Sequence, residues 1–255
     1  MLRPIGDTIA KSKSTILQFS GGKDSTALLY LARPWLDRIT VIFAETGATF
    51  PHLVKHIEDT CRRLGAKLVV VHPPVDVFKH TLDHGLPSDV VPVEASAAMR
   101  PFLNPPATEI LQPYTQCCGA MLWEPMLKYT RDNGVDLVLR GSKRADSRVG
   151  VGPNVEVEGV TYESPLWDWS DDDVYEYLKE QGAPLPKHYE RINDSLDCWM
   201  CTAHLAHHGD QKMRYIRESY PDLWPIVSER MERVRTVLAA EMTKIIPALE
   251  VPSKG

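Results

Sequence analysis

The chain has 255 residues and a formal net charge of −5, and its residues are 43% hydrophobic and 25% charged. This composition is typical of a folded globular protein and excludes a mainly disordered or fibrous one. Because no apolar run approaches the roughly 20 residues that span a bilayer, and the N-terminus lacks the apolar stretch of a signal peptide, we expect a cytoplasmic protein without a membrane role. The negative net charge offers no overall attraction to nucleic acid.

Four short apolar, β-branched runs predict buried parallel strands at residues 14–20, 39–46, 66–73 and 135–142. Helix-length segments at 25–36 and 51–64 separate the first three runs. Such alternation predicts an α/β fold with a doubly wound, mostly parallel sheet. In a sheet of this kind the ligand binds at the carboxyl ends of the strands.

The rest of the chain predicts fewer regular elements. Residues 87–113 contain six prolines, which indicates an irregular excursion that either covers a site or is a surface insertion. Ser170 precedes three aspartates, a pattern typical of a helix N-cap, and this helix should end at Gly182. A long amphipathic helix follows Asp222. We therefore expect a nucleotide-binding domain over 1–210, including its cysteines, and a helical extension over 211–255.

The segment SGGKDS at residues 20–25 joins the first predicted strand to a helix. Gly21 and Gly22 allow a ligand close to the backbone, and the N–H groups at the helix start attract an anion. Lys23 adds a positive charge, and Ser20 and Ser25 add hydroxyls. The glycine spacing matches neither a Walker loop nor a dinucleotide-binding fingerprint, so the segment predicts a phosphate site of another kind.

This segment resembles the S-G-G-x-D-S signature of the PP-loop ATP pyrophosphatases, which grip the pyrophosphate of ATP while its α-phosphate is attacked. The resemblance implies the adenine nucleotide alpha-hydrolase-like fold. It also implies ATP with Mg²⁺ as the ligand, and Lys23 and Asp24 as catalytic residues within a nucleotide-binding loop.

Three later segments resemble the phosphoadenylyl-sulfate (PAPS) reductase group of that superfamily. They are ETGATFPHL at 45–53, RGSKRADS at 140–147 and PLWDWSDDDVYEYL at 165–178. Lys143, Arg144 and Arg148 form a basic cluster in the sequence. The resemblance implies that Lys143 and Arg144 contact phosphate or sulfate. It also implies that Gly141 lets the nucleotide approach the backbone and that Glu45 lies near the adenosine.

Four of the five cysteines occur in two pairs, Cys117 with Cys118 and Cys198 with Cys201. Four thiolates suit a [4Fe–4S] cluster or a Cys₄ zinc site. Adjacent cysteines are awkward for tetrahedral zinc, which favours the cluster; a redox disulfide and four buried thiols are the other readings. The order CC…CxxC resembles the cluster site of adenylyl-sulfate (APS) reductases and implies a [4Fe–4S] cofactor.

The reductases of this group carry a catalytic cysteine in a C-terminal E-C-G-L-H tail, whereas this sequence ends in LEVPSKG. The remaining thiol, Cys61, shares a helical face with Leu53 and Ile57 and is expected in the core. The phosphate loop is complete here and degenerate in the reductases. Together with the cysteine pattern, it resembles the ATP pyrophosphatases of DNA phosphorothioate modification and, less closely, cluster-dependent tRNA thiolases.

We therefore expect an Fe–S-containing ATP pyrophosphatase that adenylylates an acceptor for sulfur transfer. Its expected partners are a cysteine desulfurase as sulfur donor and a nucleic acid reached through another protein. One alternative is an APS or PAPS reductase that releases sulfite, and another is a nucleotide-binding subunit without turnover. The acceptor, and the formation of a homodimer, are left open.

Overall fold

The computed structural model describes residues 5–102, 109–146, 152–196, 198–205 and 210–249. The chain forms two compact units, one of Met1–Pro74 with Leu122–Asp197 and the other of Val75–Met121 with Cys198–Gly255. This division differs from the expected boundary between residues 210 and 211. It arises because the segment before residue 121 packs with the C-terminal helices rather than with the sheet.

The first unit contains a six-stranded sheet in the order β3-β2-β1-β6-β8-β7. Its strands are β1 (Thr15–Gln18), β2 (Ile39–Ala44), β3 (Lys67–Val71), β6 (Leu137–Leu139), β7 (Asn154–Val157) and β8 (Val160–Glu163). Neighbouring strands run parallel except for β7, which pairs antiparallel with β8. The predicted doubly wound, mostly parallel sheet is confirmed; the β7–β8 hairpin was not predicted.

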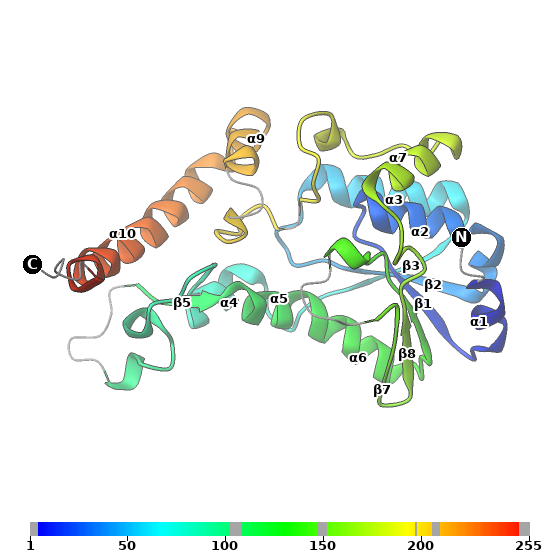
Figure 1. Ribbon diagram of the computed structural model, residues 1–255, viewed down its shortest axis with the longest axis horizontal. Coiled ribbons are helices and arrows are strands. Elements are labelled where there is room, and N and C mark those ends of the chain that lie inside the picture. The colour runs from blue at the N-terminus through cyan, green and yellow to red at the C-terminus, as the bar shows by residue number, and fades with distance from the viewer. Residues whose placement is uncertain (1–4, 103–108, 147–151, 197, 206–209, 250–255) are drawn as a thin grey trace, which may run out of the picture. The chain divides into compact units, whose positions relative to one another are not determined.

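Helices pack on both faces of this sheet (Figure 1). On one face lie α1 (Ile5–Lys11), α2 (Lys23–Leu31), α3 (Pro51–Leu64) and α7 (Asp171–Glu180), which share a core with Leu17 and Val41. On the other face α6 (Glu124–Asp132) packs on Ile16 and Ile42. Burial on both faces explains why the strands are continuous apolar runs.

The expected helix over 25–36 is shorter in the structure. It ends at Leu31 and is followed by the 3₁₀ segment η1 (Arg33–Arg38), which has Pro34 at its start. Proline has no N–H to continue the helical hydrogen bonds, so the helix stops before it. The Ser170 prediction is confirmed, because Ser170 and Asp173 form a capping box at the start of α7.

The strand order creates a switch point at β1. The chain runs from β1 outward through β2 and β3, and then returns to place β6 on the other side of β1. The loops that follow β1 and β6 therefore leave the sheet side by side at its carboxyl edge. This is where open α/β sheets bind their ligands.

The second unit holds a short parallel pair, β4 (Leu86–Ser88) with β5 (Leu111–Pro113), within the proline-rich excursion. Its helices are α4 (Val77–His84), α5 (Tyr114–Cys118), α9 (Gln211–Ser219) and α10 (Trp224–Leu249), with the short segments η2 (Val93–Ala95) and η3 (Arg100–Phe102). A π-helical turn, η4 (Gly119–Trp123), follows α5. Leu86 and Leu111 pack against Val234 of the predicted long C-terminal helix.

No helix in the described part of the chain is both long enough and apolar enough to cross a membrane.

Asp136, just before β6, ties that strand to the entry of β1. Its carboxylate accepts hydrogen bonds from the Ser12 hydroxyl at 2.5 Å and from the backbone N–H groups of Lys13 and Ser14 at 3.0 Å. Burial alone would raise the pKa of Asp136, but these hydrogen bonds outweigh it and hold the pKa below its ordinary value.

We predict that Asp136→Asn lowers the free energy of unfolding by about 1–3 kcal/mol at neutral pH, because the acceptor loses its charge. The lowered pKa means that the wild-type carboxylate stabilises the fold fully above its ordinary pKa and loses this effect as the pH falls through the lowered value. The difference between the two proteins in urea unfolding should therefore shrink in acid. Asp132→Asn, at an exposed ion pair with Lys128, is the control and should change stability by less than about 1 kcal/mol. Equal losses for both variants would contradict the prediction.

Candidate functional site

The phosphate loop at residues 20–25 follows β1 at the switch point. Gly21 has a φ of +77°, and a Cβ there would lie 2.9 Å from the Ile57 side chain, so glycine is required on both counts. Gly22 is the N-cap of α2 and offers no side chain to the N–H groups of the first helical turn. The hydroxyls of Ser20 and Ser25 lie 3.2 Å apart. The loop thus has the backbone geometry of an anion site.

Two almost fully buried lysines meet two aspartates at this loop. Lys23 is 7% exposed and Lys143 is 1% exposed. The Lys23 ammonium lies 2.8 Å from an Asp24 oxygen and 3.0 Å from an Asp171 oxygen. The Lys143 ammonium lies 2.9 Å from the other Asp24 oxygen and also pairs with Asp171. We call these four side chains the lysine–aspartate network.

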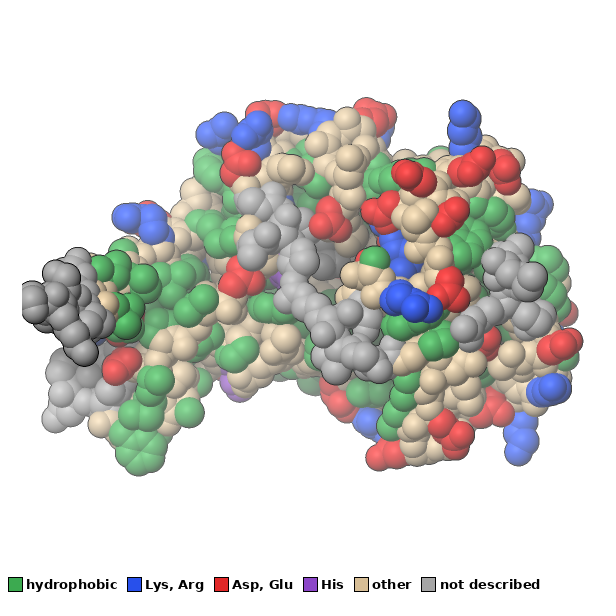
Figure 2. Space-filling model, viewed as in Figure 1, with side chains coloured by type: hydrophobic (Ala, Val, Ile, Leu, Met, Phe, Trp, Pro, Cys, Tyr) green, Lys and Arg blue, Asp and Glu red, His purple; other side chains and the backbone are tan. Residues whose placement is uncertain are grey.

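Within the network, the pKa shifts of Lys23 and Asp171 both favour the charged form. Burial alone would lower the pKa of Lys23, but hydrogen bonds with Asp24 and Asp171 outweigh it and raise that pKa. Burial alone would raise the pKa of Asp171, but its interactions with the two lysines outweigh burial and lower that pKa. The Asp171 side chain is 59% exposed against 26% for Asp24, so Asp171 is the partner that a ligand displaces more readily. Acidic side chains gather over α7, where Asp171 begins the helix (Figure 2).

Gly141, just after β6, packs against the phosphate loop itself. A Cβ there would lie 2.9 Å from the Ser25 nitrogen and 3.0 Å from the Asp24 carbonyl carbon. The sequence resemblance implied that this glycine admits the nucleotide; the structure shows that it also admits the loop backbone. This close packing carries Lys143, two residues later, to Asp24.

Arg144 and Glu45 lie outside the lysine–aspartate network. The Arg144 side chain is 71% exposed and pairs with Asp168. The Glu45 carboxylate, just after β2, accepts the Gly47 N–H at 2.7 Å and so stabilises the turn that follows the strand. Both residues follow strands that neighbour β1. Among the described residues of the predicted basic cluster, only Lys143 lies at the phosphate loop. Arg148 lies outside the described residues.

Two residues at the loop, Tyr189 and Asp171, were not predicted from the sequence. The hydroxyl of Tyr189, on the 3₁₀ segment η6 (Lys187–Glu190), accepts the backbone N–H of Lys23 at 2.9 Å. Next to Tyr189, a ring nitrogen of His188 lies 3.0 Å from one of His52, and burial lowers the pKa of both histidines to about 4. They are therefore neutral at pH 7. Asp171 was interpreted as a helix-start residue alone, and Tyr189 belongs to no local motif, so no sequence signal placed either residue here.

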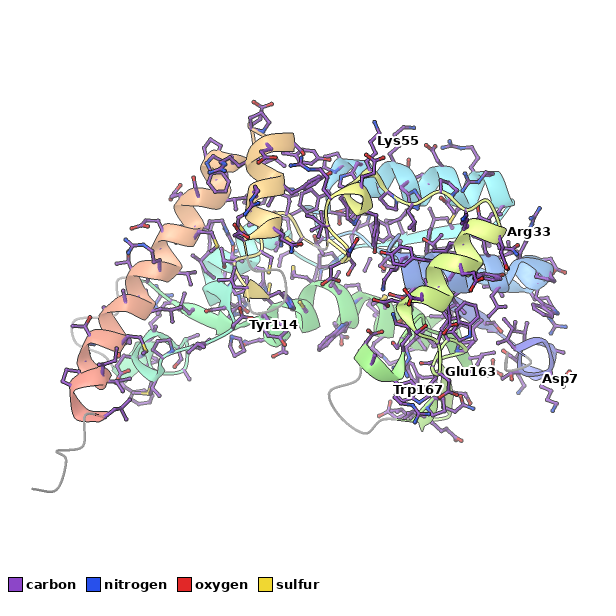
Figure 3. The ribbon with its side chains drawn as sticks, turned by 45° about the horizontal axis from the view of Figure 1, so that its top comes forward. Asp7, Arg33, Lys55, Tyr114, Glu163 and Trp167 are labelled. Atoms are coloured by element: carbon purple, nitrogen blue, oxygen red, sulfur yellow. The ribbon has the colours of Figure 1, made fainter. Side chains whose placement is uncertain are left out.

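The four paired cysteines all belong to the second unit. Cys117 and Cys118 end α5, whose first residue, Tyr114, is labelled in Figure 3, and Cys198 and Cys201 precede α9. The thiols of Cys117, Cys198 and Cys201 interact electrostatically, and burial raises the pKa of Cys117 and of Cys198 to about 12. No disulfide joins these four cysteines in the structure.

A single metal ion and an iron–sulfur cluster require different distances between the sulfur atoms of their ligands. Within the described residues, no three histidine, cysteine or acidic side chains are arranged to hold one ion. A zinc ion draws its four sulfurs to about 2.3 Å from a common centre. The ligands of a four-iron cluster each bind a different iron and stand farther apart. The cysteine pairs thus remain a candidate cluster site.

Cys61 is a core residue, as the sequence predicted. It lies on α3, is 2% exposed and packs in the core of the first unit with Ile57 and Leu137. Burial raises the pKa of its thiol to about 11, so it stays protonated at neutral pH. A thiol in this state is a poor nucleophile.

Comparison with known proteins places these features in context. A family model described as the phosphoadenosine phosphosulfate reductase domain matches residues 14–204. An uncharacterized protein of Methanocaldococcus jannaschii is 27% identical over 86% of this chain, and a second from the same organism is 22% identical over 81%. This chain spans 42% and 44% of the lengths of those two proteins. An adenosine 5'-phosphosulfate reductase of Burkholderia cepacia is 23% identical over 64% of this chain and 60% of its own length.

Solved structures share the fold. The phosphoadenylyl-sulfate reductase of Candida auris, in a phosphate complex, superposes with a TM-score of 0.55 at 14% identity, covering 76% of this chain and 86% of its own. The FMN adenylyltransferase of Candida glabrata, in complex with FAD and inorganic pyrophosphate, superposes with a TM-score of 0.50 at 15% identity, covering 76% of this chain and 58% of its own. Identities this low show the fold alone.

We predict that Asp171→Asn binds inorganic pyrophosphate more tightly in the absence of divalent cations, by about tenfold. The substitution removes a carboxylate that competes with the anion for Lys23 and Lys143. Titration calorimetry in a chelator measures the change. The neighbouring Asp172→Asn, which removes the same charge at an exposed position, is the control and should bind as the wild type does. Unchanged or weaker binding by Asp171→Asn would show that the carboxylate does not compete.

Proposed function

The chain belongs to the phosphoadenosine phosphosulfate reductase domain family, and from this premise we propose that it is an ATP pyrophosphatase that adenylylates an acceptor for sulfur transfer. Membership of the family supports a nucleotide-binding enzyme. The observation that carries the finer proposal is the complete phosphate loop joined to two buried lysines, Lys23 and Lys143. Two positive charges at a helix start suit a pyrophosphate group better than a single sulfate.

The chemistry follows from this placement. An acceptor oxygen attacks the α-phosphorus of ATP, an O–P bond forms, and the bond to the β-phosphate oxygen breaks to release pyrophosphate. Lys23 and the N–H groups of the loop stabilise the charge that develops on the departing pyrophosphate, and Lys143 adds a second positive charge. The carboxylates of Asp24 and Asp171 are hard oxygen ligands suited to the Mg²⁺ that accompanies ATP. A sulfur nucleophile then attacks the acceptor atom that carries the adenylylated oxygen. A bond from that atom to sulfur forms, its bond to the oxygen breaks, and AMP leaves with the oxygen.

The four paired cysteines fit a [4Fe–4S] cluster in this proposal. They lie in one unit, and three of their thiols are near enough to interact electrostatically. Cys117, Cys118, Cys198 and Cys201 would be its ligands, and the cluster would supply thiolate-ligated iron able to handle electrons or sulfur. A cysteine desulfurase is the proposed sulfur donor. Because the net charge of −5 does not attract DNA or tRNA, a partner protein would provide the nucleic-acid contact.

The competing proposal is a sulfonucleotide reductase, which the family description and the Burkholderia relative favour. That reaction needs an exposed thiolate to take the sulfite group. Cys61 is buried and protonated, and the other four thiols are those proposed for the cluster. The shared fold does not decide between the two, because reductases and adenylyltransferases both use it.

We predict that Lys23→Ala weakens ATP binding by about ten- to a hundredfold, the cost of one charged contact of about 1.5–3 kcal/mol. Asp24→Ala should act in the same direction. Lys128→Ala is the control, because Lys128 is an exposed residue of α6 paired with Asp132. Titration calorimetry with MgATP measures all three, and equal affinities would mean that the loop is not the binding site.

The products of the reaction separate the two enzyme proposals. Pyrophosphate release from MgATP is assayed beside sulfite release from APS or PAPS with thioredoxin, each with and without DNA, tRNA and a cysteine desulfurase. We expect pyrophosphate that depends on an acceptor and disappears with Lys23→Ala or a chelator. Sulfite formed at a rate independent of ATP would establish the reductase instead, and nucleotide binding without either product would indicate a non-catalytic subunit.

We predict that protein purified without oxygen is brown and holds about four irons per chain. Serine at any one of the four paired cysteines should reduce the iron content and the visible absorption, whereas Cys61→Ser should keep both, because Cys61 lies in the core of the other unit. Iron analysis and absorption spectra measure the outcome. One zinc per chain and no iron would contradict the cluster.

A further inference from the structure

Arg230 is a buried cation that the fold leaves unsatisfied. It lies on α10 and is 7% exposed, and its Nε and one terminal nitrogen find no hydrogen-bond partner in the described part of the chain. Burial of a guanidinium without a counter-charge is strongly destabilising. Folded proteins therefore place an anion beside such a group.

The groups that interact electrostatically with Arg230 are three cysteines, which favour its charge, and Arg233, which opposes it. The three thiols are those of Cys198, Cys201 and Cys117. The next arginine on the same helix face, Arg233, is satisfied by Glu109, whose carboxylate accepts two hydrogen bonds at 2.6 and 2.9 Å. Among the described residues no such carboxylate pairs with Arg230, and the interactions that favour its charged form come from the three thiols.

A second buried cation supports the same segment. Lys212 of α9 is 4% exposed, and its ammonium donates a hydrogen bond to the carbonyl oxygen of Cys198 at 2.9 Å. It also interacts electrostatically with the Cys198 thiol. Two buried positive charges thus lie beside thiols that are neutral when protonated, and negative charge on the sulfurs would stabilise this arrangement.

We propose that Arg230, assisted by Lys212, is the counter-charge of an anionic four-thiolate metal centre at these cysteines. This inference rests on the proposed cofactor. Four thiolates around a [4Fe–4S] core, or around zinc, carry a doubly negative charge, which a buried guanidinium and ammonium balance. Arg230 is a positioning residue here: it favours the thiolate form of the ligands and stabilises the more negative, reduced state of a cluster.

The experiment compares three variants of the anaerobically purified protein by iron content, absorption spectrum and midpoint potential. Arg230→Gln removes the charge, and Arg230→Lys keeps it. Arg235→Gln, at an exposed residue of the same helix paired with Glu232, is the control. We expect Arg230→Gln to disfavour reduction of the cluster at least tenfold, a shift of about 59 mV to lower potential. The lysine variant should shift less, and the control should match the wild type.

Each further outcome either supports or overturns the proposed role of Arg230. If Arg230→Gln loses its iron, Arg230→Lys must retain it, and equal loss from both variants overturns the proposal. A folded Arg230→Gln protein with unchanged iron and potential also overturns it. If the wild type holds zinc, the proposed cluster fails, and the counter-charge is then judged by zinc affinity, which Arg230→Gln should lower at least tenfold. A wild type that binds neither metal under reducing conditions overturns both.

Discussion

The close contact between Gly141 and the backbone of Asp24 and Ser25 is the constraint on which the candidate site depends. It joins the loops that leave β1 and β6, the two strands on either side of the switch point. A side chain at this position would meet backbone atoms at 2.9–3.1 Å, which cannot move without shifting α2. Because the two loops are held together here, Lys143 reaches the same carboxylates as Lys23 although 120 residues separate them in the sequence.

The lysine–aspartate network has a consequence for what the site binds. Two buried lysines alone would repel each other and lose hydration, and pairing with Asp24 and Asp171 offsets these costs. Binding is therefore an exchange of partners rather than a simple addition. A metal–triphosphate complex offers both halves of the exchange, since its phosphates replace the carboxylates at the lysines and its cation receives the carboxylates. A sulfonucleotide that binds without a metal offers only the first half, which supports the proposed preference for MgATP.

Much of the fold could be predicted from the sequence because it is encoded locally. Runs such as the one ending at Gln18 are apolar on both faces, and the spacing of Leu53, Ile57 and Cys61 marks one helix face. The parts that were missed depend on distant segments. Asp171 was interpreted as a helix-start residue because it lies within the cap that Ser170 and Asp173 form. Its pairing with the buried lysines appears only when α7 packs beside α2. The contact of Tyr189 with Lys23 spans 166 residues, and no periodicity reports it. The grouping of residues 75–121 with the C-terminal helices also joins segments far apart in the sequence, which local patterns do not report.

The segment that carries Cys198 and Cys201 is fixed to the rest of the second unit by contacts that involve no sulfur. The Thr202 hydroxyl, next to Cys201, donates to the Pro87 carbonyl at 2.5 Å, and the N–H groups of His204 and Leu205 donate to the Asp89 carboxylate at 2.9 and 2.8 Å. The ring of Trp199, between the cysteines of the second pair, packs 5.8 Å from that of Phe78. These contacts use no sulfur, so they hold the C-terminal pair in the second unit independently of a cofactor. In small zinc domains, by contrast, the metal itself supplies the folding energy. In the proposed metal centre, a preformed scaffold would leave the free energy of metal binding available for deprotonating thiols of raised pKa, a step whose cost a buried cation such as Arg230 would lower.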